Sequence, residues 1–246
     1  MNRNNLTLLI AFLVFVLGPI ITASGDMVPF SDNFESYTVG AAPPSPWIQK
    51  YNSNSVIVAP GFGGAGQAVE LRGAWNWSDT LYVNLTYSDT FTFHVACMVE
   101  NGAAAAGQLQ FSGSMVYDWN SIWFGPDWNK ISWFDGTTIV PYCNEDTWYQ
   151  ADVKISGYLG SNPTADVIVY DEAGVQLGAQ FGLSAVNIGT TSQQQFVLHT
   201  RSQPLNGQGA VATFDNINVV PVPGAVFLGS IGLGLAGWRL KRRREL

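Results

Sequence analysis

Histidine and cysteine are scarce in this chain of 246 residues, which has two of each. A zinc site usually needs three or four His, Cys or acidic ligands at tight spacing, and no H-E-x-x-H motif occurs. The phosphate-binding motif G-x-x-x-x-G-K-[ST] and the hydrolase motif G-x-S-x-G are absent as well. His94 and His199 both fall within strand-like patterns, where we expect structural or surface roles. These absences argue against zinc enzymes, P-loop proteins and hydrolases of the G-x-S-x-G type.

Positive charge is scarce outside the two ends of the chain. Six of the 11 Lys and Arg residues lie at positions 3, 239 and 241–244. The body between residues 26 and 219 keeps five basic and 17 acidic residues, a net charge of −12. Such a body does not suit nucleic acid, whose binding depends on Lys and Arg at phosphates. It suits an exported protein, or one that meets cations.

The two cysteines, Cys97 and Cys143, allow one disulfide. Exported chains fold in an oxidising space, where disulfides persist. Because the sequence does not give the separation of the two residues, a disulfide and a pair of buried thiols both stay open.

The first 25 residues have the order of a secretory signal peptide. Arg3 is the one charged residue before Asp26, an apolar run follows from Leu6 to Ile21, and small residues stand at 23–25. The run is shorter than the roughly 20 residues that a spanning helix needs. We therefore predict cleavage near residues 23–25 rather than a retained anchor.

The chain ends on a proline pair, an apolar stretch and a basic cluster. A transmembrane helix is predicted at about residues 224–240, because membrane helices tolerate the glycines found there. The basic residues after it would stay on the cytoplasmic side: Lys241, Arg242, Arg243 and Arg244. The span is short, which favours a transient anchor over a permanent C-terminal one.

This order resembles the PEP-CTERM sorting signal of Gram-negative bacteria. The matching motif is Val220, Pro221, Val222, Pro223 and Gly224, although the family has Glu where this chain has Val222. The resemblance implies export through the inner membrane and cleavage near the prolines by exosortase, a membrane transpeptidase. The product would lie at the cell surface or outside the cell, associated with exopolysaccharide.

Residues 26–219 read as one domain of short strands and turns. In FTFHVACMVE, alternate residues are apolar, as in a half-buried strand: Phe91, Phe93, Val95, Cys97 and Val99. Several other segments alternate in the same way, and Tyr170 to Gly174 reads as a polar turn. Because no long amphipathic helix and no fixed repeat occurs, we predict an antiparallel β-sandwich or barrel.

The order of the segments resembles the concanavalin A-like, or laminin G-like, jelly rolls of exported bacterial proteins. Four segments carry the resemblance: FSDNFESYTVGAAPPSPW at 30–47, GGAGQAVELRG at 63–73, TWYQADVKI at 147–155 and ATFDNINVV at 212–220. It implies an all-β sandwich whose first and last strands lie near each other, so that the C-terminal tail would leave from a sheet edge beside the N-terminus. It also implies a structural calcium there, near Asp32, Glu35 and Asp215, for which turn hydrogen bonds are the alternative role.

Gly61 to Gly66 matches the dinucleotide-binding pattern G-x-G-x-x-G. That pattern needs a helix after it to meet the pyrophosphate, whereas QAVELRG alternates like a strand. We therefore predict a turn between strands.

Nine tryptophans are many for this length, and most gather in two segments rich in Asn, Asp and Gly. Aromatic rings among such side chains suit glycan binding, and core packing is the alternative. The tryptophans with the most polar neighbours are Trp77, Trp119 and Trp128.

Some relatives of this fold are glucanases, which carry their carboxylates in a Glu-x-Asp-x-Glu pattern on one strand. No such run occurs, and adjacent pairs such as Glu145-Asp146 would point to opposite faces of a strand. We therefore expect a non-catalytic, surface-directed protein of the exopolysaccharide or biofilm matrix that binds glycans. A purely structural surface protein and a divergent glycoside hydrolase or lyase are the alternatives.

Overall fold

The structure is a computed structural model, which describes residues 27–50, 54–73, 79–112, 115–186, 194–201 and 209–222, without the side chains of 108–119. The predicted signal peptide, the helix at 224–240 and the basic cluster Lys241–Arg244 lie outside the described residues. Within the described ranges, no helix has the length and hydropathy needed to cross a membrane.

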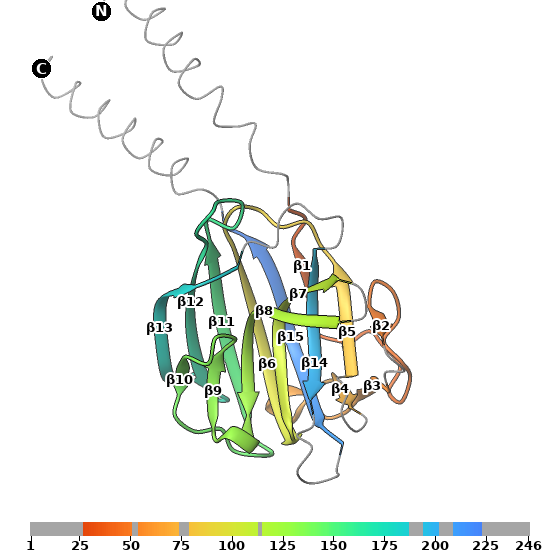
Figure 1. Cartoon of the computed structure of the whole chain (residues 1–246). Coiled ribbons are helices and arrows are strands. Elements are labelled where there is room, and N and C mark those ends of the chain that lie inside the picture. The colour runs from red at the N-terminus through yellow and green to blue at the C-terminus, as the bar shows by residue number, and fades with distance from the viewer. Residues whose placement is uncertain are drawn as a thin grey trace, which may run out of the picture.

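Two antiparallel sheets lie face to face (Figure 1). The eight-stranded sheet has the order β13 (Gln176–Ser184), β12 (Thr164–Asp171), β11 (Trp148–Ser156), β6 (Phe91–Asn101), β15 (Val211–Pro221), β4 (Ala68–Arg72) and β3 (Val56–Val58), with β1 (Phe30–Asp32) also paired to β15. The seven-stranded sheet has the order β10 (Thr138–Val140), β9 (Lys130–Trp133), β8 (Met115–Gly125), β7 (Ala103–Ser112), β14 (Gln195–Arg201), β5 (Asp79–Asn84) and β2 (Ile48–Lys50). Two short 3-10 turns, η1 (Phe62–Gly64) and η2 (Pro126–Trp128), complete the described elements. The predicted all-β sandwich is confirmed.

The core lies between the sheets because each strand turns alternate side chains inward. On β6 the predicted inward set is buried: Phe91, Phe93, Val95, Cys97 and Val99. From the other sheet, Phe196 of β14 meets Phe93, with ring centroids 5.5 Å apart. The other alternate side chains of each sheet form its outer face, and core packing does not constrain which residues stand there.

The first and last strands lie together, as predicted. Phe30 lies opposite Val219, and β15 is an interior strand because β6 pairs with its other side. β15 runs to Pro221, and the Val222 N–H donates to the Thr90 carbonyl at 3.0 Å. The sheet therefore includes the first part of the predicted sorting motif, whereas Pro223 and Gly224 lie outside the described residues.

The Gly61–Gly66 segment is a turn between strands, as predicted, because β4 follows it instead of a helix. Phe62 packs edge-on against Trp148 of β11, with ring centroids 5.5 Å apart. Gly63 and Gly64 have φ angles of 71° and 73°, which glycine adopts without strain. The turn covers part of the outer face of the eight-stranded sheet.

Two carboxylates hold this turn in place by accepting hydrogen bonds from its backbone. Asp215 Oδ2 accepts a hydrogen bond from the Phe62 N–H at 2.9 Å, and Glu35 Oε1 accepts one from the Gln67 N–H at 2.9 Å. A Cβ on Gly61 would lie 2.8 Å from Asp215 Oδ2, so glycine lets the turn approach the carboxylate. The turn thus depends on acidic side chains from β15 and from the segment after β1.

Asp215 makes stability depend on pH. Burial raises the pKa of its carboxyl, the charges of Glu35 and Asp32 raise it further, and the N–H bonds from Phe62 and Asn216 lower it. Because the folded-state pKa lies above the unfolded value, the group favours the folded state at low pH. That contribution is lost as pH rises through the folded-state pKa.

Asp215→Asn tests this assignment, because it removes both the titration and one acceptor oxygen. At pH about 4 we expect the variant to be less stable than wild type by about 1–2 kcal/mol, since one backbone N–H loses its acceptor. This deficit should shrink as pH rises to about 7, because only the wild-type carboxylate becomes charged. Urea unfolding at both pH values measures it, with the exposed Asp135→Asn as control. A deficit that grows with pH would contradict the assignment.

Candidate functional site

The outer face of the seven-stranded sheet carries most of the positive charge of the acidic body. Three of the body's five basic residues point outward from it: Lys50, Lys130 and Arg201. Among the outward strand residues whose side chains are described here, there is no Asp or Glu; Asp127 lies in the adjoining turn η2. We call this surface the basic face. Its local positive charge is opposite in sign to the net charge of the body.

Cross-strand pairing lines up one row of residues across the basic face. In order from β9 to β2 they are Ser132, Trp123, Ala105, His199, Thr80 and Lys50. The rings of Trp123 and His199 lie with their centroids 4.9 Å apart, and these residues are 7% and 2% exposed. Lys50, at the end of the row, is partly exposed, and burial lowers the pKa of its ammonium.

A neighbouring row carries an indole ring and two basic residues. Lys130 lies opposite Gly125, and Arg201 lies opposite Ala103. Trp128 lies over Gly125, where an added Cβ would come within 2.6 Å of its Cε3 atom. Its ring also packs on Trp123, with centroids 5.4 Å apart. The partly exposed Trp128 therefore lies among the outward positions of an ammonium and a guanidinium.

Two buried oxygens on the basic face have no hydrogen-bond partner within the described residues: Ser121 Oγ and Gln195 Oε1. The amide nitrogen of Gln195 donates to Asn84 Oδ1 at 3.0 Å, so the amide is fixed in place. A buried acceptor without a donor costs free energy.

The β7–β8 hairpin changes direction over this face. Its register shifts near Gly107 and Asn120, whose φ angles are 146° and 59°. The Asn120 side chain donates to the Val186 carbonyl at 2.8 Å and accepts from the Val186 N–H at 2.7 Å. In Figure 1 the far half of the hairpin crosses in front of β14 and β5. This placement agrees with the low exposure of His199.

The predicted glycan-binding tryptophans belong to this sheet where the structure describes them. Trp128 lies on the basic face; the backbone of Trp119 lies in β8 opposite Gln108, and its side chain is outside the description. Trp77 lies outside the described residues. Trp133, from the same tryptophan-rich segment as Trp128, is a core residue. The polar neighbours in the sequence did not distinguish a tryptophan on the surface from one in the core.

The predicted calcium residues contact protein groups. Asp32 Oδ1 accepts from the Phe34 N–H at 2.8 Å, while its Oδ2 accepts from Tyr37 Oη at 2.6 Å and Trp47 Nε1 at 2.7 Å. Glu35 and Asp215 hold the glycine turn. Within the described ranges, no group of three or more His, Cys, Asp or Glu is arranged to hold a metal ion. Calcium binding stays a prediction.

Cys97 and Cys143 are both buried free thiols, so the structure has no disulfide between them. Burial raises the pKa of both thiols, that of Cys143 to about 12. Neither thiol is a reactive nucleophile, because reactivity depends on the thiolate.

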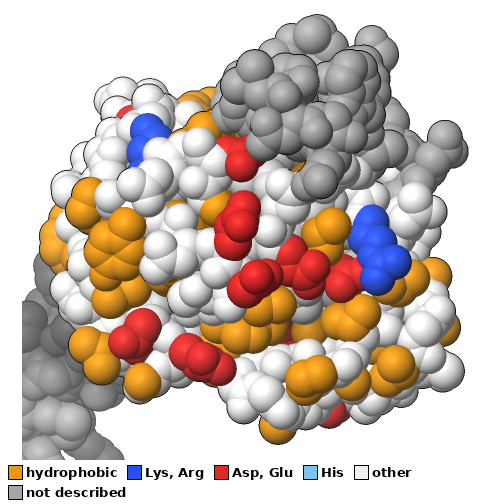
Figure 2. Space-filling model, turned by 90° about the horizontal axis from the view of Figure 1, so that it is seen from below, with side chains coloured by type: hydrophobic (Ala, Val, Ile, Leu, Met, Phe, Trp, Pro, Cys, Tyr) orange, Lys and Arg blue, Asp and Glu red, His pale blue; other side chains and the backbone are white. Residues whose placement is uncertain are grey.

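One end of the sandwich is acidic. Figure 2, which views the molecule from below, shows Asp and Glu side chains gathered across this end with few Lys or Arg. Glu100 lies within electrostatic range of Glu70 and Asp146: burial raises the pKa of its carboxyl, and these two charges raise it further. The positive charge of the basic face therefore does not extend to this end of the molecule.

Solved structures share this fold, although no protein-family model and no curated protein matches the sequence. A mutant of the alginate lyase Aly36B in complex with alginate tetrasaccharide has a TM-score of 0.53 at 12% identity, covering 79% of this chain and 97% of that one. The endo-β-1,4-glucuronan lyase of the fungus Trichoderma reesei has a TM-score of 0.50 at 9% identity, covering 75% and 96%. Peanut lectin has a TM-score of 0.51 at 8% identity, covering 81% and 100%.

At these identities the likenesses show the fold alone: a lectin-like jelly-roll sandwich. The prediction of a non-catalytic protein is contradicted. It rested on the missing carboxylate pattern of glucanases, and the fold is shared with enzymes of another class, the polysaccharide lyases. The comparisons give no support to the predicted PEP-CTERM signal or its exosortase partner. The chain has the jelly-roll fold found in both lectins and polysaccharide lyases.

Proposed function

We propose that this protein binds an acidic polysaccharide, built from uronic acids, on its basic face. The observation that carries the proposal is the placement of Trp128 among the outward positions of Lys130 and Arg201. A sugar ring packs its C–H face on an indole, and a uronate carboxylate pairs with a guanidinium or ammonium group. Neighbouring units of one polysaccharide chain can make the two kinds of contact.

The charge distribution supports an anionic ligand at this face. A polyanion is repelled by a body of net charge −12, so it binds only where cations are concentrated. Three of the five basic residues of the body point outward from this one sheet. The solved structures of similar fold include lyases named for the polyuronates alginate and glucuronan, which supports the same ligand class.

Arg201→Ala and Trp128→Ala test the proposal. We expect each to weaken the binding of an alginate or glucuronan hexasaccharide at least about tenfold, because a charge-assisted hydrogen bond or a ring contact is lost. Calorimetry with the protein body, taken as residues 26–222 so that β15 is whole, measures the affinity. Arg72→Ala is the matched control, because Arg72 is exposed and lies on the eight-stranded sheet beside Glu70.

The control variant should bind as wild type does. Equal losses in Arg201→Ala and Arg72→Ala would mean that only net charge matters, and no loss in Arg201→Ala would contradict the proposed site. Parallel titrations with calcium and with EDTA test the predicted calcium site, which is supported only if EDTA weakens binding or lowers stability.

A second candidate function is cleavage of the polyuronate by β-elimination. Lys50 and Tyr82 lie on the neighbouring strands β2 and β5 of the basic face, both are partly exposed, and burial lowers the pKa of Lys50. In this reaction a base removes the proton on C5, the C4–O bond breaks, a C4–C5 double bond forms, and an acid protonates the leaving oxygen. No co-reactant is needed.

Ultraviolet absorbance of the new double bond measures this reaction directly. We expect Tyr82→Phe and Lys50→Gln to lower the rate at least about a hundredfold, because removing a general acid or base costs about 10²–10⁴ in rate. If wild type binds the polymer but produces no unsaturated product, the elimination proposal fails and the binding proposal stands.

We further propose that the protein is exported through the inner membrane of a Gram-negative bacterium and processed by exosortase. The order of proline motif, apolar stretch and basic cluster supports this proposal. Because β15 extends to Pro221 and the Val222 N–H is bonded to Thr90, a cut after Val222 leaves the sheet intact. Mass spectrometry of the mature chain should find its C-terminus at 222–224. A chain that ends within β15, or that keeps residues 241–246, would contradict the proposal.

A further inference from the structure

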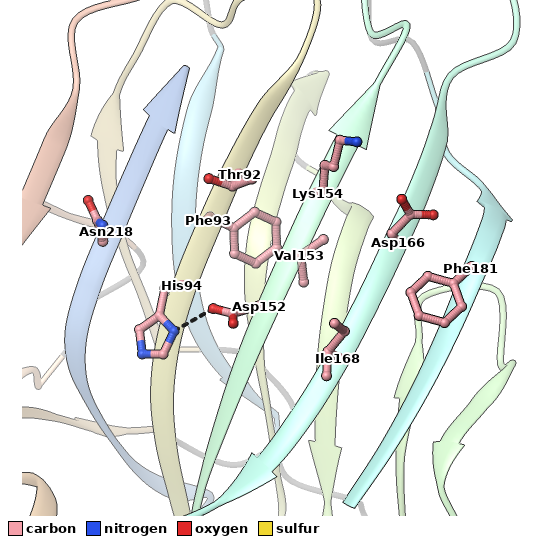
Figure 3. Close-up of a pocket in the computed structure, with 10 residues that line it drawn as sticks. All are labelled: Thr92, Phe93, His94, Asp152, Val153, Lys154, Asp166, Ile168, Phe181 and Asn218. Atoms are coloured by element: carbon pink, nitrogen blue, oxygen red, sulfur yellow. Dashed lines mark hydrogen bonds and ion pairs between the residues drawn. The ribbon is translucent and has the colours of Figure 1, made fainter. Parts of the chain in front are cut away.

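We infer a second carbohydrate site, specific for neutral glycans, on the outer face of the eight-stranded sheet. A hollow of about 440 Å³ lies over β6, β11, β12 and β13, and Figure 3 shows its lining. A second hollow, of about 710 Å³, lies over β1 and β15. His94 and Asn218 line both hollows, so the two join into one groove, which we call the acidic groove.

The groove crosses the strands. One row of paired residues follows it: Ser31, Asn218, His94, Asp152, Ile168 and Ala179. These residues come from six neighbouring strands, so the row is about 24 Å long at the usual strand spacing of ~4.8 Å. The groove is long enough for several sugar rings of an extended chain. The backbone of the interior strands is already paired in the sheet, so recognition must come from side chains.

Aromatic rings stand at both ends of the groove. Phe181 of β13 is 67% exposed and lies beside Asp166 (Figure 3). Tyr37 and Phe30 line the other end, where Tyr37 donates to Asp32 Oδ2 at 2.6 Å. An exposed aromatic ring next to hydrogen-bonding groups offers the two contacts that a sugar needs, a flat apolar surface and acceptors for its hydroxyls.

The middle of the groove carries fixed polar groups. His94 Nδ1 lies 2.7 Å from Asp152 Oδ1, directly across the β6–β11 pair, and both side chains are partly open to solvent. Burial raises the pKa of the Tyr170 hydroxyl, and Asp152 raises it further, so Asp152 contacts groups on both sides. The pairing holds the imidazole in one orientation, which leaves Nε2 for a ligand.

The charge of the groove selects a ligand different from that of the basic face. Asp32, Asp152 and Asp166 line it with one Lys, Lys154, which lies opposite Asp166. The excess of carboxylates disfavours a polyuronate. It suits a neutral glycan, whose hydroxyl groups donate to carboxylates. We therefore assign the groove to a neutral polysaccharide.

The two sites lie on opposite outer faces of the sandwich. One molecule can then hold an acidic and a neutral polysaccharide chain at the same time. Linking two chains in this way raises the effective affinity for a mixed network without any new contact.

Calorimetry of the protein body with neutral hexasaccharides of glucose, xylose and mannose tests the acidic groove. We expect binding to at least one of them and a loss of about tenfold or more in Phe181→Ala, because the variant removes the exposed apolar ring on which a sugar would pack. Asp152→Asn should also weaken binding. Tyr142→Ala is the matched control, because Tyr142 is an exposed aromatic residue outside the groove.

The outcomes separate this site from the basic face. Arg201→Ala should leave neutral-glycan binding unchanged, and Phe181→Ala should leave polyuronate binding unchanged. No binding of any neutral hexasaccharide, or a loss that is equal in Phe181→Ala and Tyr142→Ala, would overturn the inference. So would a polyuronate whose binding depends on Phe181.

Discussion

Burial of alternate side chains between two sheets is the constraint on which the rest of the molecule depends. Because the inward positions of β6, β11, β8 and β14 are apolar and almost fully buried, they hold the sheets together without help from the outward positions. The outward residues are therefore free to carry charge and hydrogen-bonding groups. One sheet carries Lys50, Lys130 and Arg201 on its outer face, and the other carries the acidic groove.

Loops decide how much of each outer face is open. On the eight-stranded sheet, the glycine turn at 61–66 covers the patch around Trp148, and Asp215 and Glu35 hold it there. The acidic groove occupies the part that this turn leaves free. On the seven-stranded sheet, the bend of the β7–β8 hairpin at Gly107 and Asn120 accompanies a buried row around His199. Of the residues on the basic face that reach solvent, Lys50 ends that row, and Trp128, Lys130 and Arg201 lie beside it.

Local patterns in the sequence predicted the strands well, because period-two alternation needs only neighbouring residues. The β6 alternation, the glycine turn and the turn at 170–174, where the Gly174 N–H bonds to Asp171, are all present. The site was harder to predict, because it depends on pairing between distant strands. Lys50 joins the row of His199 only through the β2–β5–β14 register. The absence of a glucanase pattern was also too narrow a ground for excluding catalysis, because the fold is shared with lyases.

The central claim is that the basic face, and not the acidic groove, holds an acidic polysaccharide. The most direct measurement is NMR of the isotope-labelled protein body during titration with an alginate tetrasaccharide. The account predicts shifts in the indole signals of Trp123 and Trp128, which pack together on the basic face. The ring signals of Phe181 should stay unchanged. Shifts confined to Phe181 and the other residues of the acidic groove, or no shift at saturating ligand, would contradict it.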